Sequence, residues 1–115
     1  MTEDKANFMF FIDRAARDEA KDLFGYLGFG INAAVAMLMS RIAHGRTVPL
    51  DFSLYVDPAI AYSRDKVKVT VCLDRYVRDE ATKVIRDLSL GNTELMEHFI
   101  NECLVKQAIP FAVRK

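Results

Sequence analysis

The chain has 115 residues, 51% of them hydrophobic and 28% charged, which is the composition of an ordinary globular domain. Sixteen basic residues balance 16 acidic ones, so binding to a polyanion requires the positive charges to gather on one face. No stretch approaches the roughly 18 consecutive apolar residues of a membrane span, and the polar, acidic start does not resemble a secretory signal. Cys72 and Cys103 form no CxxC pair. We therefore expect two reduced thiols in a cytoplasmic protein.

The first predicted elements are a short strand over residues 7–12 and two helices. Asp13 is placed to cap the first helix, and Gly30, after a tight turn that includes Gly28, to cap the second. The second helix is expected to end near Gly45. Both helices carry apolar residues at the spacing of one helical face. These are Ala16, Ala20, Leu23, Phe24 and Leu27 in the first helix, and Val35, Leu38, Met39 and Ile42 in the second.

Residues 51–65 follow as a connector with turn-like segments, Asp57-Pro58 and 63–65. Leu54, Tyr55 and Ile60 are candidates to anchor it on the core. We interpret the connector as a partly ordered linker.

A second strand and two further helices are predicted after the linker. In the strand, residues 66–73, Val67, Val69, Val71 and Leu73 alternate with Lys66, Lys68, Thr70 and Cys72, which gives one apolar and one polar face. Asp74 and Gly91 are the predicted helix caps, with Ser89 in the turn between the helices. The apolar stripes are Val77, Ala81, Val84, Ile85 and Leu88, then Met96, Phe99, Ile100 and Cys103, with the last helix ending before Pro110.

The two halves of the chain repeat each other at an offset of 61 residues. Setting Asp13 against Asp74 aligns the pattern Asp-Arg-x-x-Arg-Asp-Glu-Ala twice without a gap. The further identities are Leu27 with Leu88, Gly30 with Gly91, and Pro49 with Pro110. We therefore predict an internal duplication, with copy 1 in residues 1–50 and copy 2 in residues 66–115.

A single strand–helix–helix unit cannot stand alone, because a lone strand leaves its backbone groups unpaired and the unit buries little apolar surface. We predict a mainly helical fold in which the two strands pair antiparallel, with Phe10 and Val71 on the buried face. The four helices would cover that face, so that the two copies form one structural domain. The alternative is a domain-swapped assembly in which each copy pairs with a copy in another chain.

Three segments of copy 1, residues 7–13, 27–29 and 48–50, resemble the RelB/DinJ antitoxin family of toxin–antitoxin systems. Copy 2 resembles it again at residues 68–74, 88–92 and 108–111. The resemblance implies a tandem ribbon-helix-helix fold, a single-chain pseudo-dimer whose ribbon enters the major groove of double-stranded DNA. The N-termini of the second helices are similar to the phosphate anchors of that fold. Those positions are Gly30, Ile31 and Asn32 in copy 1, and Gly91, Asn92 and Thr93 in copy 2.

The facing of the ribbon implied by the resemblance gives the candidate DNA-binding residues. They are Asn7, Met9 and Phe11 from the first strand, and Lys66, Lys68, Thr70 and Cys72 from the second. Lysine can donate to guanine or phosphate, and threonine can hydrogen-bond or touch a thymine methyl. The alternative is that the lysines belong to a solvated polar face.

Met9 and Phe11 cannot read hydrogen-bonding patterns, so copy 1 is either a degenerate reader or part of a contact surface. We predict that both lie beside Thr70 and Cys72 across the ribbon and are at least partly covered, by another copy of the protein. The alternative is that two exposed apolar residues are tolerated.

The predicted function is transcription regulation by DNA binding. The alternative is an antitoxin-derived protein-interaction module that has lost DNA recognition or that neutralises a toxin through the linker. Members of the family carry one copy and then a tail that wraps a ribonuclease toxin, whereas here the sequence ends five residues after Pro110. A toxin partner is therefore not expected.

No phosphate-binding loop, catalytic triad or carboxylate pair appears in the sequence, so we expect neither an enzyme nor a cofactor. His44 and His98 lack nearby ligand-type residues, so we interpret both as ordinary helix residues and expect no metal site. The Arg-Asp-Glu runs at residues 17–19 and 78–80 are predicted to be solvated helix faces with local ion pairs.

Overall fold

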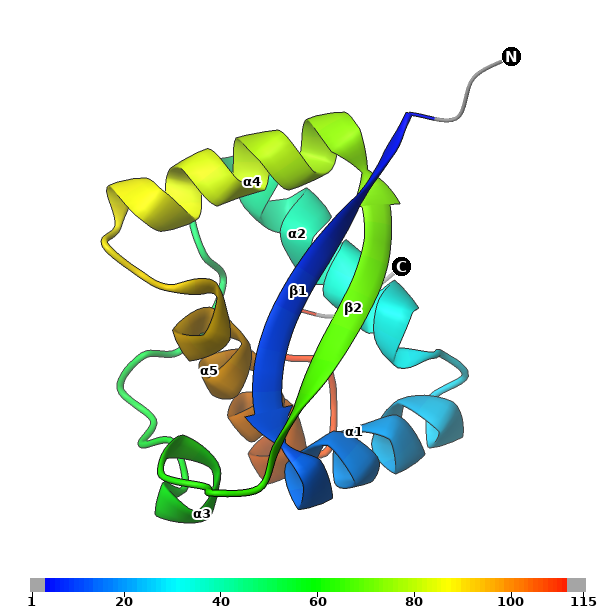
Figure 1. Cartoon of the computed structure of the whole chain (residues 1–115), viewed down its shortest axis with the longest axis vertical. Coiled ribbons are helices and arrows are strands. Elements are labelled where there is room, and N and C mark those ends of the chain that lie inside the picture. The colour runs from blue at the N-terminus through cyan, green and yellow to red at the C-terminus, as the bar shows by residue number, and fades with distance from the viewer. Residues whose placement is uncertain (1–3, 112–115) are drawn as a thin grey trace.

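The computed structural model describes residues 4–111 and is mainly helical, with one two-stranded antiparallel sheet, as predicted (Figure 1). Each strand leads directly into a helix, and a second helix follows after a short turn. In chain order the elements are β1 (Lys5–Asp13), α1 (Arg14–Tyr26), α2 (Ile31–Gly45), α3 (Pro58–Ala61), β2 (Lys66–Asp74), α4 (Arg75–Asp87) and α5 (Asn92–Lys106).

The strands β1 and β2 pair with each other along their whole length. Phe8 lies opposite Val71 and Phe10 opposite Val69, and all four side chains are buried, which confirms the predicted facing. Met9 lies opposite Thr70 as predicted. The prediction that Phe11 lies beside Cys72 was wrong, because the register places Phe11 opposite Lys68. Cys72 lies two positions beyond Thr70, opposite Asn7.

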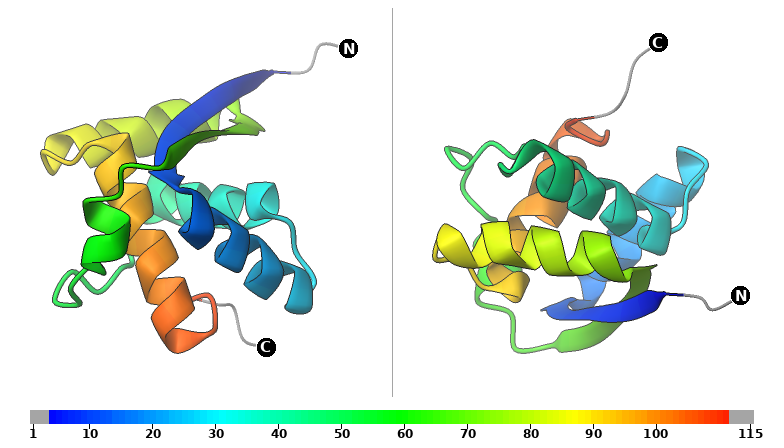
Figure 2. Two further views of the ribbon diagram at one scale, coloured as in Figure 1. Left: turned by 60° about the horizontal axis from the view of Figure 1, so that its bottom comes forward. Right: turned by 90° about the horizontal axis from the view of Figure 1, so that it is seen from above.

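The helices cover one face of the ribbon and leave the other face open (Figure 2). They pack across the two halves of the chain: α2 lies against α4, and α1 lies against α5. At the second contact the rings of Phe24 and Phe99 stack, with their centroids 6.3 Å apart. The buried residues form one hydrophobic core drawn from both halves, so neither half has a core of its own.

The predicted helix caps are confirmed. The Asp13 carboxylate accepts a hydrogen bond from the Ala16 amide, and Asp74 accepts from the amides of Tyr76 and Val77. Gly30 and Gly91 are the N-caps of α2 and α5 and have extended backbones.

Four residues with left-handed backbones terminate or connect the helices. Gly28 and Ser89 (φ 94° and 60°) lie in the turns between helices. Arg46 and Gln107 (φ 59° and 54°) are the C-caps of α2 and α5. Glycine tolerates this conformation best, but Ser89, Arg46 and Gln107 adopt it as well. In each of the two pairs the residues stand 61 positions apart.

Leu27 and Leu88 were predicted to lie on the buried stripes of the first helices, and this was wrong. Both are C-cap residues, with 37% and 51% of their surface exposed. The chain leaves the helical path at the left-handed residue that follows each of them, so their side chains lie beyond the part of the stripe that the neighbouring helix covers. The earlier stripe positions Ala16, Ala20, Leu23 and Phe24, and Ala81, Val84 and Ile85, are buried, with Val77 partly buried.

The linker is docked on α5 and contains the short helix α3, which the sequence did not predict. The buried Asn101 side chain accepts from the Asp57 amide at 3.1 Å and donates to the Tyr55 carbonyl at 2.8 Å. Next to it, the buried Glu102 accepts from the Asp51 amide at 2.9 Å. Two polar side chains of α5 therefore hold the backbone of residues 51–57.

The three predicted linker anchors behave differently. Ile60 in α3 is buried, as predicted, and Leu54 is partly buried. The Tyr55 side chain is 95% exposed, so the prediction for it was wrong. Its carbonyl, held by Asn101, makes the anchoring contact instead.

Replacing Asn101 with alanine should lower the free energy of unfolding by about 1–3 kcal/mol, because the Tyr55 carbonyl and the Asp57 amide would lose their partner. Ser40→Ala changes the position 61 residues earlier, which holds no linker, and should cost less than about 0.5 kcal/mol. Urea denaturation followed by circular dichroism measures both. Equal losses in the two variants would contradict the anchoring role of Asn101.

Candidate nucleic-acid interface

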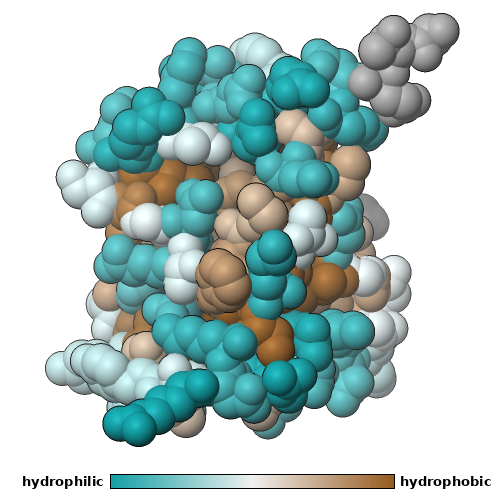
Figure 3. Space-filling model, in the orientation of Figure 1, coloured by the Kyte–Doolittle hydropathy of each residue, from teal (hydrophilic) through white to brown (hydrophobic). Residues whose placement is uncertain are grey.

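The outer face of the ribbon carries the exposed side chains of Asn7, Met9 and Phe11 of β1 and of Lys68, Thr70 and Cys72 of β2, with Lys5 at the start of β1. They alternate along each strand with the buried residues, because successive side chains of a strand point to opposite faces. On this side of the molecule apolar surface shows between hydrophilic side chains (Figure 3). Met9 and Phe11 contribute to it, with 48% and 49% of their surfaces exposed.

Lys66 was predicted to be a DNA contact, but its ammonium group is already engaged. Its Nζ atom lies 3.1 Å from Oε2 of Glu97 and 3.4 Å from the Ala61 carbonyl. The Lys66 side chain is 29% exposed, and that of Glu97 only 12%. Lys66 pairs with Asp13 at the end of the ribbon, where α3 and α5 supply these acceptors. The ion pair therefore holds Lys66 toward the helices.

The N-termini of α2 and α5 lie at the two edges of the ribbon. The Cys72 amide donates to Oδ1 of Asn32 at 2.9 Å, and Nδ2 of Asn32 lies 3.4 Å from the Cys72 carbonyl. At the other edge the Phe11 amide donates to Oγ1 of Thr93 at 3.2 Å. Each strand is therefore tied to a second helix from the other half of the chain.

The six predicted phosphate-anchoring residues form the first turns of these two helices. Neither Gly30 nor Gly91 makes a side-chain cap hydrogen bond. The first amides of a helix lack intrahelical acceptors and favour an anion. Gly30, Asn32 and Gly91 are exposed, and Ile31, Asn92 and Thr93 are partly buried. The additional role of Asn32 and Thr93 in tying the ribbon edges was missed, although both are polar residues two positions after a predicted cap.

Most cations beside the ribbon are already paired. Arg14 pairs with Asp65 and Arg75 with Asp4, at 3.1 and 2.7 Å. Arg78 pairs with Asp79 at 2.8 Å and also donates to the Asn7 carbonyl. In the part of the chain that the structure describes, Lys68 and Lys5, which lies at the start of β1 on the same side as Asn7, form no ion pair, so these two are the cations that the outer face offers to a ligand.

The other predicted candidates are placed away from any common site. Nδ1 of His44 lies 2.8 Å from the Ser40 carbonyl, and the His98 ring meets the edge of Phe52 at 4.9 Å. Within residues 4–111 no group of three or more His, Cys, Asp or Glu is arranged to hold a metal ion. The expected local ion pair of the first Arg-Asp-Glu run is present as Arg17–Asp18, at 2.8 Å.

The two thiols lie in different environments. Cys72 is exposed on the outer face of the ribbon, and Cys103 is buried in α5. Burial raises the pKa of the Cys103 thiol to about 12, and the neighbouring Glu102 adds to the shift. Cys103 is therefore a protonated core residue, and Cys72 is the thiol that a ligand on the ribbon would meet.

Comparison with known proteins gives no indication of function. No family model, no curated protein and no solved structure matches the chain. Of the helices in residues 4–111, none alone is long and apolar enough to cross a membrane, and the pair α1 and α2 reaches that length only with an 87° bend between them. A functional proposal therefore rests on the geometry of the outer face of the ribbon and on the residues that it carries.

Of the two lysines of β2, Lys66 makes an ion pair that stabilises the fold, and Lys68 is exposed and makes none. Lys66→Ala should lower the free energy of unfolding by about 1 kcal/mol, because Glu97 would remain largely buried without its partner. Lys68→Ala removes an equal charge from the exposed face and should change stability by less than about 0.5 kcal/mol. Chemical denaturation of both variants measures the difference, and a larger loss for Lys68→Ala would refute the assignment.

Proposed function

We propose that the protein is a DNA-binding transcriptional regulator that resembles the DNA-binding part of the RelB/DinJ antitoxins and acts in the cytoplasm. The observation that carries the proposal is an open antiparallel ribbon with a helix N-terminus at each edge. A two-stranded ribbon fits the major groove, which is about 12 Å wide. The first turns of α2 and α5 would then approach phosphates on either side of it.

We further propose that the chain is a tandem duplication folded as a ribbon-helix-helix pseudo-dimer. Contacts that repeat at the offset of 61 support this. The Arg14 amide donates to the Asp65 carbonyl and the Arg75 amide to the Asp4 carbonyl, both at 2.9 Å. The ion pairs of the same residues, the left-handed turns and the two edge contacts follow the same offset.

Recognition by this ribbon would depend mainly on β2. Lys68 can donate to guanine or to a phosphate, and Thr70 can contact a thymine methyl. From β1, Asn7 and the exposed Lys5 have side chains that can hydrogen-bond to a base, whereas Met9 and Phe11 cannot. Since Lys66 is engaged with Glu97, few cations face the groove, so affinity should be modest and strongly dependent on salt.

A second function, a protein-interaction module, is favoured by Met9 and Phe11. The two half-exposed side chains stand on alternate positions of β1 and form an apolar area beside Thr70 and Lys68. Burying such side chains contributes roughly 1.5–3 kcal/mol each. A second copy of the chain is the partner that we propose for this surface. Toxin binding through the linker is not part of the proposal, because Asn101 and Glu102 hold the linker on α5.

The test of DNA binding is a salt titration with nonspecific duplex DNA. The unmodified protein should bind at low salt, and Lys68→Ala should flatten the dependence of log K on log salt by up to about 0.9 for one lost phosphate contact. Lys21→Ala removes an exposed lysine from α1 and should leave the slope unchanged. Weaker binding of Lys68→Ala with an unchanged slope would mean that Lys68 contacts a base. If the unmodified protein does not bind DNA at low salt, the result favours the function of a protein-interaction module.

The variant Phe11→Lys distinguishes a ribbon whose outer face is covered by a second copy of the chain from a ribbon that binds DNA. If a second copy covers Met9 and Phe11, light scattering should show a smaller assembly for the variant, because a charge cannot be buried there without a partner. If the face enters the groove, the variant should instead change DNA affinity. When neither the mass nor the affinity changes and the fold is intact, Phe11 is an exposed residue with no contact role.

A further inference from the structure

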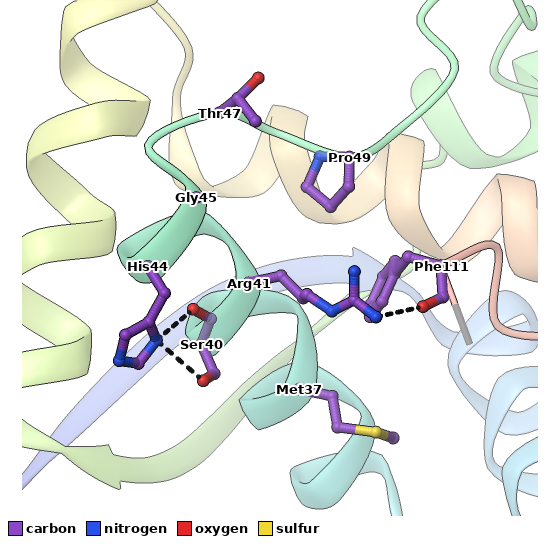
Figure 4. Close-up of a pocket in the computed structure, with 8 residues that line it drawn as sticks. All are labelled: Met37, Ser40, Arg41, His44, Gly45, Thr47, Pro49 and Phe111. Carbon is purple, nitrogen blue, oxygen red and sulfur yellow. Dashed lines mark hydrogen bonds between the residues drawn. The ribbon is translucent and has the colours of Figure 1, made fainter. Parts of the chain in front are cut away.

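A groove lies along the C-terminal half of α2. This helix lies on the side of the molecule away from the ribbon (Figure 2). Its volume is about 540 Å³. Figure 4 shows Met37, Arg41 and His44 projecting from successive turns of α2, with Pro49 and Phe111 on the opposite wall. The other lining residues are Ser40, Gly45 and Thr47. None of these eight residues carries a carboxylate.

The corresponding surface of α5 is covered by an extended segment of the chain. The residues 61 positions after Met37, Ser40 and Arg41 are His98, Asn101 and Glu102. Asn101 and Glu102 hold the backbone of residues 51–57, and the Phe52 ring packs against His98. The same surface of the same kind of helix therefore binds an extended peptide on α5 and is open on α2.

We propose that the α2 groove binds an extended, acidic segment of a partner protein, in the way that α5 binds residues 51–57. On α5 the key side chain, Glu102, accepts a hydrogen bond from a backbone amide. On α2 its place is taken by Arg41, which can only donate. The occupant must therefore supply acceptors, and carboxylates are the strongest of these for a guanidinium group.

Arg41 is positioned for such a contact. Its Nη2 atom donates to the Phe111 carbonyl at 3.0 Å, and its guanidinium carbon lies 5.6 Å from the centre of the Phe111 ring. These two contacts fix the orientation of the group and use one of its five N–H donors. The side chain is exposed. In the described part of the chain Arg41 makes no ion pair, whereas nearby Arg46 is paired with Glu80.

The linker of the same chain does not fill this groove, because it is held on α5. Leu50, which leads the chain onto α5, stands 61 positions before Phe111, which borders the α2 groove. The groove therefore has an entrance, an apolar wall and a cation but no occupant from residues 4–111. An occupant there would leave the outer face of the ribbon open.

The probe is a fluorescently labelled peptide with the sequence of residues 50–62, the one segment seen on such a surface, which carries two aspartates and no basic residue. Fluorescence anisotropy with the full chain at low salt should show binding. Arg41→Gln should weaken it about tenfold, as expected for a lost charge-assisted hydrogen bond. Arg64→Gln, an equal loss of charge at an exposed turn residue, should have no effect. A peptide with both aspartates changed to asparagine should bind several-fold more weakly.

Met37→Glu is a second variant that places a carboxylate one turn before Arg41, where it competes for the guanidinium group, and it should also weaken binding. Three results would overturn the proposal. The first is a peptide that does not bind at low salt. The second is binding that depends on Asn101 and not on Arg41, which would mean that the peptide displaces the linker from α5. The third is a self-association of the full chain that Arg41→Gln abolishes, which would make the linker of a second copy the occupant. The assay contains no DNA, so its outcome is independent of the DNA-binding test.

Discussion

The pairing of β1 with β2 is the constraint on which the rest of the structure depends. It satisfies the inner backbone groups of both strands and places Phe8, Phe10, Val69 and Val71 on one face. The helices must cover that face, and they do so by packing across the two halves. The outer edges of the ribbon still present amides, and Asn32 and Thr93 accept two of them. The position of the helix N-termini beside the ribbon therefore follows from the strand pairing.

Much of this architecture could be predicted from local patterns. The alternation in residues 66–73 predicted which face of the ribbon is buried. The offset of 61 identified residues 7–12 as the strand that pairs with it. Asp13 and Asp74 identified the helix starts because capping uses neighbouring residues. The linker was harder to predict, since residues 51–57 have no periodicity and their partners, Asn101 and Glu102, lie far away in sequence. The ion pair of Lys66 could not be predicted for the same reason, because alternation gives the side of a strand but not a distant partner such as Glu97.

The two halves carry different residues at positions that stand 61 apart. β2 keeps lysine and threonine on the outer face where β1 has phenylalanine and methionine. The second helices differ as well, because α5 carries acceptors at Asn101 and Glu102 and α2 carries Ser40 and Arg41 at the same positions. In a symmetric dimer every substitution appears twice and must suit both places. A single chain is free of this limit, so the two strands and the two second helices can carry different residues at the same positions, as they do here.

The ribbon also forms between two strands of one covalent chain, and this affects how the protein responds to its own abundance. Ribbons made from separate chains fall apart on dilution, since their assembly follows mass action. Here dilution leaves the partner strand attached, so the folded fraction is the same at any dose. The amount of folded ribbon then rises in proportion to the number of chains synthesised, rather than with its square. A cell that makes few copies of the protein would have the same fraction of them folded as a cell that makes many.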